Sequence, residues 1–524
     1  MASTLALSLY LPLLAGALAL VWRRPSFALY AFVVGLALHN AAMAALYAAG
    51  VRGGALSAIQ AWKELLLVAA AGSVARAAWR ARRLPFRPRA VDLLALAFAL
   101  VVVVYALLPQ RALGGAAGTE AVLLSLRSAL LPVAAYGLGR ALGLGSAELR
   151  RLSWTVLGTA AGLAAVGLVD QYALSVEWWR DAQVPAYFRE ELGFVYHGPG
   201  GMPENFAFNS ADGVFRRLIS TFVSPLASAF LLGIALLVTA AVVSLRRPHA
   251  VVLATLAAAG LLFTLSRSTL IALAAGFVVL ALARRRAWPV GAAAATLVVG
   301  VAFASVFTSI APRTHFFPAE LAYQEAQARL RGGLPQGDGT LSLEESSIRS
   351  HLTSLRADAG DVLRHPQGYG LGNAGAVARR TGTELKAGES NYTELGAETG
   401  VLGLGLFLAW SVLLLAGLIR TARAGGDAVH GRAAAGLAAS LATVLVLAVQ
   451  TDAIGVPWVA LCVWWLAGAL VAVPPERRSL PFEGGERDRP RSGHRPRAPE
   501  GGGDRALARL LLRRARFRGD AALG

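Results

Sequence analysis

The 524-residue chain has little of several residue types, and each shortage excludes a class of protein. Its single cysteine, Cys462, sits inside an apolar run, which excludes an internal disulfide and a cysteine-based metal site. Charged residues make up only 15% of the chain, whereas about a quarter is usual in soluble domains. No internal repeat is obvious, which disfavours carriers built from two inverted halves. An ordinary soluble domain and a disulfide-stapled secreted domain are therefore both excluded.

Hydrophobic residues, by contrast, make up 56% of the chain, and apolar runs near 20 residues recur along it. About 20 apolar residues form a helix that crosses the ~30 Å hydrocarbon core, and a helix satisfies its own backbone groups there. The sequence predicts an all-α, polytopic bundle of 12–13 transmembrane spans. The predicted spans are 4–21, 26–49, 56–75, 91–108, 119–139, 153–172, 218–243, 249–265, 268–283, 288–311, 400–419, 433–450 and 456–473.

The net charge of +19 is spread over the turns between these runs and the C-terminal segment, so no nucleic-acid partner is expected. Alternate short turns hold nineteen arginines, whereas the others hold only Arg52, Arg111 and Arg267. Basic residues gather on the cytoplasmic side of membrane helices, which predicts an external N-terminus and a cytoplasmic C-terminus. The first run lacks a basic leader and a small-residue cleavage site, so we expect a span rather than a cleaved signal.

Two long polar connections fall on the external side of this thread, at 173–217 and 312–399. The first mixes aromatic and acidic residues with Gly and Pro turns, and the second holds helix-compatible stretches separated by Gly-rich turns. Two such loops on one face of a bundle are where an external active site would be built. We predict a transmembrane domain over 1–473 that includes both loops. The Pro-, Gly- and Arg-rich segment 474–524 is predicted to be a disordered, basic cytoplasmic tail.

Three arginines at the external edge are candidates for binding an anion. Arg267 lies in a very short turn between two spans, where a charge is costly and usually functional. Arg216 and Arg217 end the first long connection where the chain re-enters the membrane, and guanidinium groups bind phosphate oxygens in pairs. The alternative for each is an arginine that reaches to lipid phosphates.

A Gly-rich segment, HPQGYGLGNAG (365–375), precedes GESNYTELGAETGVLGLGLFL (388–408). Glu389 in the second segment is a candidate catalytic base, and His351 in SSIRSHLTSL is a second candidate. Glu394 and Glu398 are interpreted as partners of a helix dipole.

Further charged residues lie within or beside the predicted spans. Lys63, Glu64 and Arg127 fall inside spans, and we interpret them as internal pairs. Arg127 is also near enough to the external side to contact a substrate. Asp452 is interpreted as interfacial.

Three motifs, taken in order, resemble the bacterial O-antigen ligase and O-antigen/exopolysaccharide polymerase family. They are RLISTFVSP, the turn TLSRSTLIAL, and the long loop HPQGYGLGNAG followed by ESNYTELGAETGVLG. The resemblance covers roughly residues 90–470. It implies a multi-pass glycosyltransferase of the bacterial cytoplasmic membrane whose active site faces outside. Glycan would pass from a polyprenyl-diphosphate-linked donor to an acceptor glycan or lipid without a metal or other cofactor.

The resemblance also assigns roles to single residues. Ligases of the family place a catalytic histidine where this sequence has Glu389, which favours the polymerase branches. Arg217 and Arg267, with Arg216 and Arg127 beside them, would bind the diphosphate, and Glu389 or His351 would accept the proton. Two alternatives stay open: a ligase that transfers finished glycan, and a transporter or flippase of glycan lipids. A chain-length regulator is an open partner.

Overall fold

The computed structural model describes residues 1–210, 212–330, 346–388 and 390–471. By its internal contacts the chain divides into two compact units, Met1–Glu483 and Gly484–Gly524, and every described residue belongs to the first. The predicted tail 474–524 and the predicted base Glu389 lie outside the described residues.

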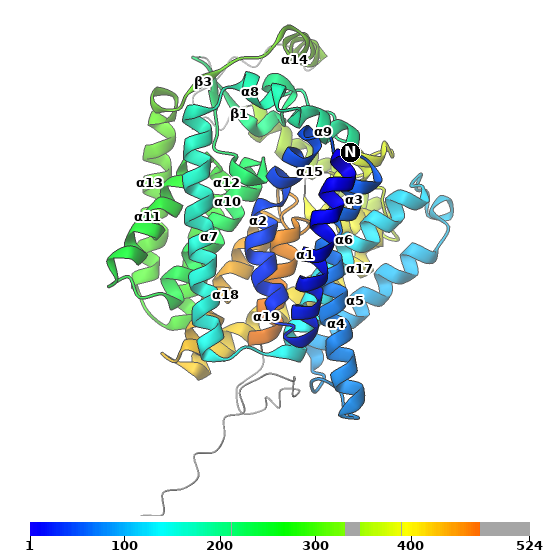
Figure 1. The fold of residues 1–524 in the computed structure, drawn as a ribbon, viewed down its shortest axis with the longest axis vertical. Coiled ribbons are helices and arrows are strands. Elements are labelled where there is room, and N and C mark those ends of the chain that lie inside the picture. Colours follow the sequence, from blue (N-terminus) through cyan, green and yellow to red (C-terminus); the bar gives the residue numbers. More distant parts are fainter. Residues whose placement is uncertain (211, 331–345, 389, 472–524) are drawn as a thin grey trace, which may run out of the picture. The chain divides into compact units, whose positions relative to one another are not determined.

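The described chain is a bundle of apolar helices, which confirms the predicted all-α polytopic fold (Figure 1). Within these residues, ten single helices are long and apolar enough to cross a membrane. They are α1 (Ala2–Arg23), α2 (Phe27–Ala48), α5 (Ala90–Leu107), α6 (Thr119–Leu142), α7 (Ser146–Ala173), α10 (Pro225–Val242), α12 (Arg267–Arg284), α13 (Trp288–Ile310), α17 (Asn391–Gly425) and α18 (Val429–Leu447).

Three further predicted spans also correspond to helices, but these are shorter or bent. The helices α3 (Gly54–Gln60) and α4 (Trp62–Arg80) meet at 44° and pass the same test only as one span. Two apolar segments are too short to pass it, α11 (Pro248–Phe263) and the π-helical turn η5 (Val459–Val463) continued by α19 (Trp464–Leu470). By length and composition the described residues thus contain 10 or 11 spans, against the 12–13 predicted.

The helices approach closely where glycine removes the side chain. A Cβ at Gly139 of α6 would collide with the Trp465 carbonyl of α19, and one at Gly468 of α19 would collide with the Tyr136 carbonyl of α6. The same holds where Gly276 of α12 meets Thr443 of α18. Small residues let membrane helices pack backbone against backbone, which lipid tails alone would not drive.

The two long connections lie at the same end of the bundle (Figure 1). The first contains α8 (Val176–Asp181), α9 (Val184–Leu192), the 3-10 turns η2 (Pro199–Gly201) and η3 (Glu204–Phe206), β1 (Ala207–Ser210) and β2 (Gly213–Arg216). The second contains β3 (Arg313–Thr314), α14 (Pro318–Leu330), α15 (Ser346–Arg364) and α16 (Gly375–Thr381). A shorter turn at this end holds η1 (Gln110–Leu113).

A small antiparallel sheet of order β1-β2-β3 joins these two connections. In its register Phe215 of β2 lies opposite Arg313 of β3. The sequence did not predict this sheet, because strands of two to four residues leave too short an alternating pattern to recognise. Through it the start of the second connection pairs with the end of the first.

Candidate functional site

The predicted span 218–243 does not enter the bundle as a helix. Helix α10 begins only at Pro225, which suits a first turn because proline has no N–H to leave unpaired. Residues before it form the 3-10 turn η4 (Ser220–Phe222), in which Ser220 has φ 52° and Val223 just after it has φ 53°. Left-handed backbone costs about 1–2 kcal/mol in a residue other than glycine. The motif RLISTFVSP is therefore an unwound, strained entry to the membrane.

Three hydrogen bonds with two neighbouring helices, α7 and α2, hold this entry in place. The Ser220 hydroxyl donates to the Leu163 carbonyl of α7 at 2.6 Å, and the Thr221 hydroxyl donates to the Ala37 carbonyl of α2 at 2.6 Å. The Asn40 amide of α2 donates to the Phe222 carbonyl at 2.9 Å. Strained backbone persists where its surroundings over-determine it, and it clusters at functional sites.

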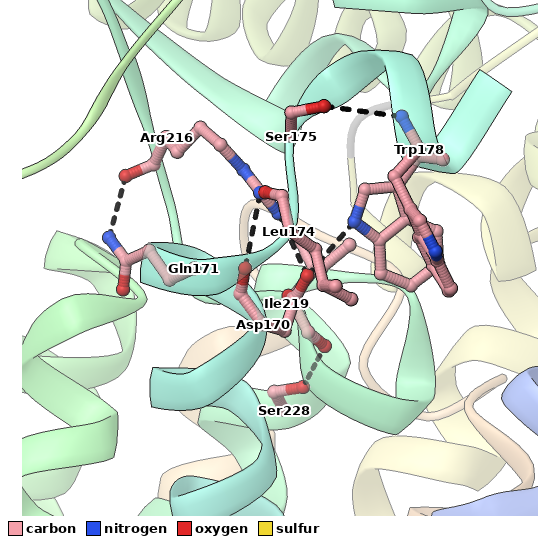
Figure 2. Close-up of polar contacts among 9 residues, drawn as sticks. Asp170, Gln171, Leu174, Ser175, Trp178, Arg216, Ile219 and Ser228 are labelled. Carbon is pink, nitrogen blue, oxygen red and sulfur yellow. Dashed lines mark hydrogen bonds and ion pairs between the residues drawn. The ribbon is translucent and has the colours of Figure 1, made fainter. Parts of the chain in front are cut away.

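Arg216 is buried, and its guanidinium binds the bundle itself (Figure 2). One of its nitrogens lies 3.0 Å from Oδ1 of Asp170, and another donates to the carbonyls of Asp170 and Leu174 at the end of α7. Trp179 Nε1 also donates to Asp170 Oδ1, at 2.9 Å. Arg216 thus fastens the first long connection to α7. The diphosphate-binding role predicted for Arg216 stays a prediction.

Arg217 points to a different part of the fold. Its Nε donates to the Thr264 carbonyl at 2.7 Å, and a terminal nitrogen donates to the Leu265 carbonyl at 3.4 Å. These carbonyls belong to the turn between α11 and α12, which ends just before Arg267. Within this turn Leu265 has left-handed backbone, with φ 47°. The structure therefore brings the first two predicted motifs together, with Arg217 seated on the turn that presents Arg267.

Helix α17, which follows Glu389, begins at the level of the turn before Arg267. Thr443 of α18 donates to the Ala272 carbonyl of α12 at 3.1 Å, which fixes the level of the two antiparallel helices. Five residues, or ~7.5 Å, further along each helix lie Arg267 and Ala448. The Ala448 carbonyl accepts from the Ser390 hydroxyl at 2.9 Å and from the Asn391 backbone N–H at 3.0 Å. Ser390 is thus anchored at the level of Arg267.

The Gly-rich loop docks against a break in α17. Gly400 interrupts that helix with φ 66° and ψ −176°, a conformation open only to glycine. The neighbouring Val401 N–H donates to the Pro366 carbonyl at 2.8 Å, and a Cβ on Gly400 would collide with that same carbonyl. The motif E-x-G therefore marks a backbone junction between the second long connection and the bundle.

Glu398 and Glu394 bind side chains and loop backbone at this junction rather than acting only on a helix dipole. Glu398 accepts from the Gly372 N–H at 2.8 Å and from the Ser125 hydroxyl of α6. The Asn391 amide donates to Glu394 at 3.2 Å and to Asp452 at 2.8 Å. Asp452, interpreted from the sequence as interfacial, is part of this network. The residues have a positioning role that the sequence did not reveal.

Of the two candidate bases, the structure describes only His351. Glu389 lies outside the described residues, although its neighbour Ser390 is placed. His351 lies on α15 with an exposed side chain, and α15 packs against α17. Among the described residues no group of three or more His, Cys, Asp or Glu side chains could hold a metal ion.

Four charged residues form a second polar cluster, which we call the Lys63 cluster: Lys63, Glu64, Arg127 and Arg380. Lys63 is buried, with Nζ 3.6 Å from Glu64, and Arg127 of α6 lies 2.8 Å from the same carboxylate. The internal pairing predicted for these three residues is thus observed. Arg380 of α16 was not predicted, because its loop position gave no sequence signal.

The fold defines a multi-pass helical membrane protein, with ten to eleven candidate spans in its described residues and two joined connections at one end. Compared with known proteins, the chain matches no family model and no curated sequence.

Proposed function

We propose that this protein is a membrane glycosyltransferase of cell-surface polysaccharide assembly, acting as a polymerase on the outer face of the bacterial cytoplasmic membrane. The observation that carries the proposal is the seating of Arg217 on the turn that presents Arg267. Two guanidinium groups on adjoining segments at a membrane interface suit a diphosphate, which is an anion with several acceptor oxygens.

The reaction transfers a glycan from a polyprenyl-diphosphate-linked donor to an acceptor sugar. The acceptor hydroxyl oxygen forms a bond to the anomeric carbon of the donor, and the bond from that carbon to the diphosphate oxygen breaks. Polyprenyl diphosphate leaves with the bonding electron pair. Arg217 and Arg267 stabilise the negative charge that develops on it, and a preorganised donor of this kind contributes about 3 kcal/mol, or about a hundredfold in rate.

The hydroxyl proton needs a base within hydrogen-bond reach of the acceptor. Glu389 is the base we propose, since Ser390 is anchored to Ala448 at the level of Arg267. His351 is the alternative, and the two are separated by Glu389→Gln and His351→Gln. The strained turns around Ser220, Val223 and Leu265 hold the arginines' surroundings rigid, as a preorganised site requires.

Complementation of cells that lack the gene tests the proposal. Arg267→Ala and Glu389→Gln should give glycans shortened to single repeat units, whereas Arg313→Ala should restore normal length. Arg313 is a suitable control because it is an exposed arginine at the same end of the bundle. Normal-length glycan from well-expressed Arg267→Ala and Glu389→Gln would contradict the proposal. Long chains left on the lipid carrier would instead indicate the ligase alternative.

A further inference from the structure

The Lys63 cluster holds more positive than negative charge in a part of the bundle where charges are costly. Glu64 forms ion pairs with both Lys63 and Arg127, at 3.6 and 2.8 Å. Arg380 is close enough for its charge to act on both of these cations. Glu120 also acts on Arg380, but within the described residues it makes no ion pair. In the described part of the chain, the cluster therefore contains three cations and only one carboxylate that is paired with any of them.

The surroundings of Arg380 show that this excess is unfavourable without a ligand. Burial lowers the pKa of Arg380, and the charge of Arg127 lowers it further. The Arg380 carbonyl lies against Gly193 at the end of α9, so the residue is held between the first long connection and α6. Within the described chain its guanidinium forms no hydrogen bond and no ion pair. Like charges held together around the buried Lys63 repel, and a bound anion would relieve that repulsion.

Residue choice at the cluster also indicates a phosphate. Lysine accounts for only two of the 50 Lys and Arg residues of the chain, and Lys63 is one of them. A compact ammonium group and two planar guanidinium groups are the side chains that bind phosphate oxygens. Trp62 Nε1 donates to His39 Nδ1 at 3.1 Å, which assigns the His39 proton to Nε2 and makes that atom a further donor beside the cluster.

Helix α2 connects the unwound entry to α10 with this cluster. That entry begins next to Arg217 and is bonded to α2 through Thr221 and Asn40, while α2 carries His39 on the cluster's side. Both cationic groups therefore lie around one polar segment. A reaction that joins two lipid-linked glycans has two diphosphates to hold, of which only one leaves.

We propose that the Lys63 cluster binds the phosphate or diphosphate group of the acceptor lipid, while Arg217 and Arg267 bind that of the donor. This inference rests on the proposed function and extends it to a second, separately built site. The donor diphosphate departs during the reaction, whereas the acceptor diphosphate stays covalently attached and is held only for positioning.

Binding of farnesyl diphosphate to the purified, detergent-solubilised full chain, counted by native mass spectrometry, tests the inference without any need for activity. The expected result is two bound equivalents. Lys63→Gln combined with Arg380→Gln should weaken one equivalent about tenfold to a hundredfold, as loss of charge-assisted hydrogen bonds implies, and Arg267→Ala should weaken the other. Arg150→Gln, an exposed arginine at the opposite end of α7, should keep both.

Arg380→Gln alone guards against misfolding, because this side chain makes no internal bond in the described chain, and its thermal midpoint should equal that of the unsubstituted protein. Two equivalents bound unchanged by Lys63→Gln with Arg380→Gln would overturn the inference. A single equivalent, lost only with Arg267→Ala, would overturn it while leaving the proposed function intact. No binding at all would contradict both. Loss of co-purified phosphatidylglycerol in place of farnesyl diphosphate would show a bulk-lipid site and also overturn it.

Discussion

Two polar clusters at the same end of the bundle, one buried and one partly exposed, differ in their balance of charge. Arg216 and Asp170 form a one-to-one pair at 3.0 Å, and the carbonyls of Asp170 and Leu174 and the indole of Trp179 add further hydrogen bonds. In the Lys63 cluster two cations pair with one carboxylate, and the charge of Arg380 acts on both of them. The comparison teaches that burial of an arginine does not by itself indicate a ligand site. A pair with balanced charge fastens the fold, and a group with excess positive charge is prepared for an anion.

The largest effect is expected from breaking the balanced pair. Asp170→Asn leaves the Arg216 charge buried without its carboxylate, which should lower the free energy of unfolding by about 3–5 kcal/mol. Unfolding in detergent, followed by circular dichroism, measures it. Asp170→Asn combined with Arg216→Gln should recover much of this loss, because no unpaired charge remains. An Asp170→Asn protein as stable as the original would contradict the claim that the Arg216–Asp170 pair fastens the fold.

A second balanced pair shows whether the distinction is general. At the opposite end of the bundle Arg140 Nε lies 2.8 Å from Asp92 Oδ1, and the Tyr136 hydroxyl donates to the same oxygen. Asp92→Asn should lower the free energy of unfolding by about 3 kcal/mol and with it the thermal midpoint. Binding of farnesyl diphosphate should be unchanged. Weaker diphosphate binding in a folded Asp92→Asn protein would show that balanced pairs also serve ligands.

In the Lys63 cluster, loss of the carboxylate should strengthen anion binding. Glu64→Gln removes the carboxylate that competes with a bound anion, so we expect affinity for farnesyl diphosphate to rise about tenfold and to depend more steeply on salt. The free energy of unfolding should fall as well, because the buried Lys63 then lacks its carboxylate, whereas the loss of the partly exposed Arg127–Glu64 pair adds little. Titration at two ionic strengths measures the affinity and its salt dependence. Unchanged or weaker binding would mean that Glu64 does not oppose an anion there.

The smallest effect is expected at an exposed pair. Asp427, in the turn between α17 and α18, accepts a hydrogen bond from Arg284 and lies 3.0 Å from Arg286, and these contacts lower its pKa. A lowered folded pKa stabilises the fold above the unfolded value of Asp, and the contribution disappears as pH falls through the folded value. Asp427→Asn should therefore narrow the difference in thermal midpoint between neutral and strongly acidic pH. A wider difference would reverse this sign.

Much of the bundle followed from the sequence, because a membrane span needs about 20 apolar residues and leaves a continuous signal. The roles of Arg216 and Arg217 could not be separated in this way. They are neighbours in one basic pair, and strand β2 ends at the first of them, so only the three-dimensional fold decides which faces Asp170 and which faces Thr264. The partners of Arg216 and Arg380 are likewise distant in sequence, and periodicity carries no information about such contacts.

The central claim is that Arg217 and Arg267 together stabilise the departing diphosphate. Its most direct test is the rate at which purified protein releases polyprenyl diphosphate from a lipid-linked glycan donor in the presence of acceptor. The account predicts that Arg267→Ala slows this release about a hundredfold at an unchanged thermal midpoint, while Arg313→Ala releases at the original rate. An Arg267→Ala protein that is folded and releases polyprenyl diphosphate at the original rate would contradict it.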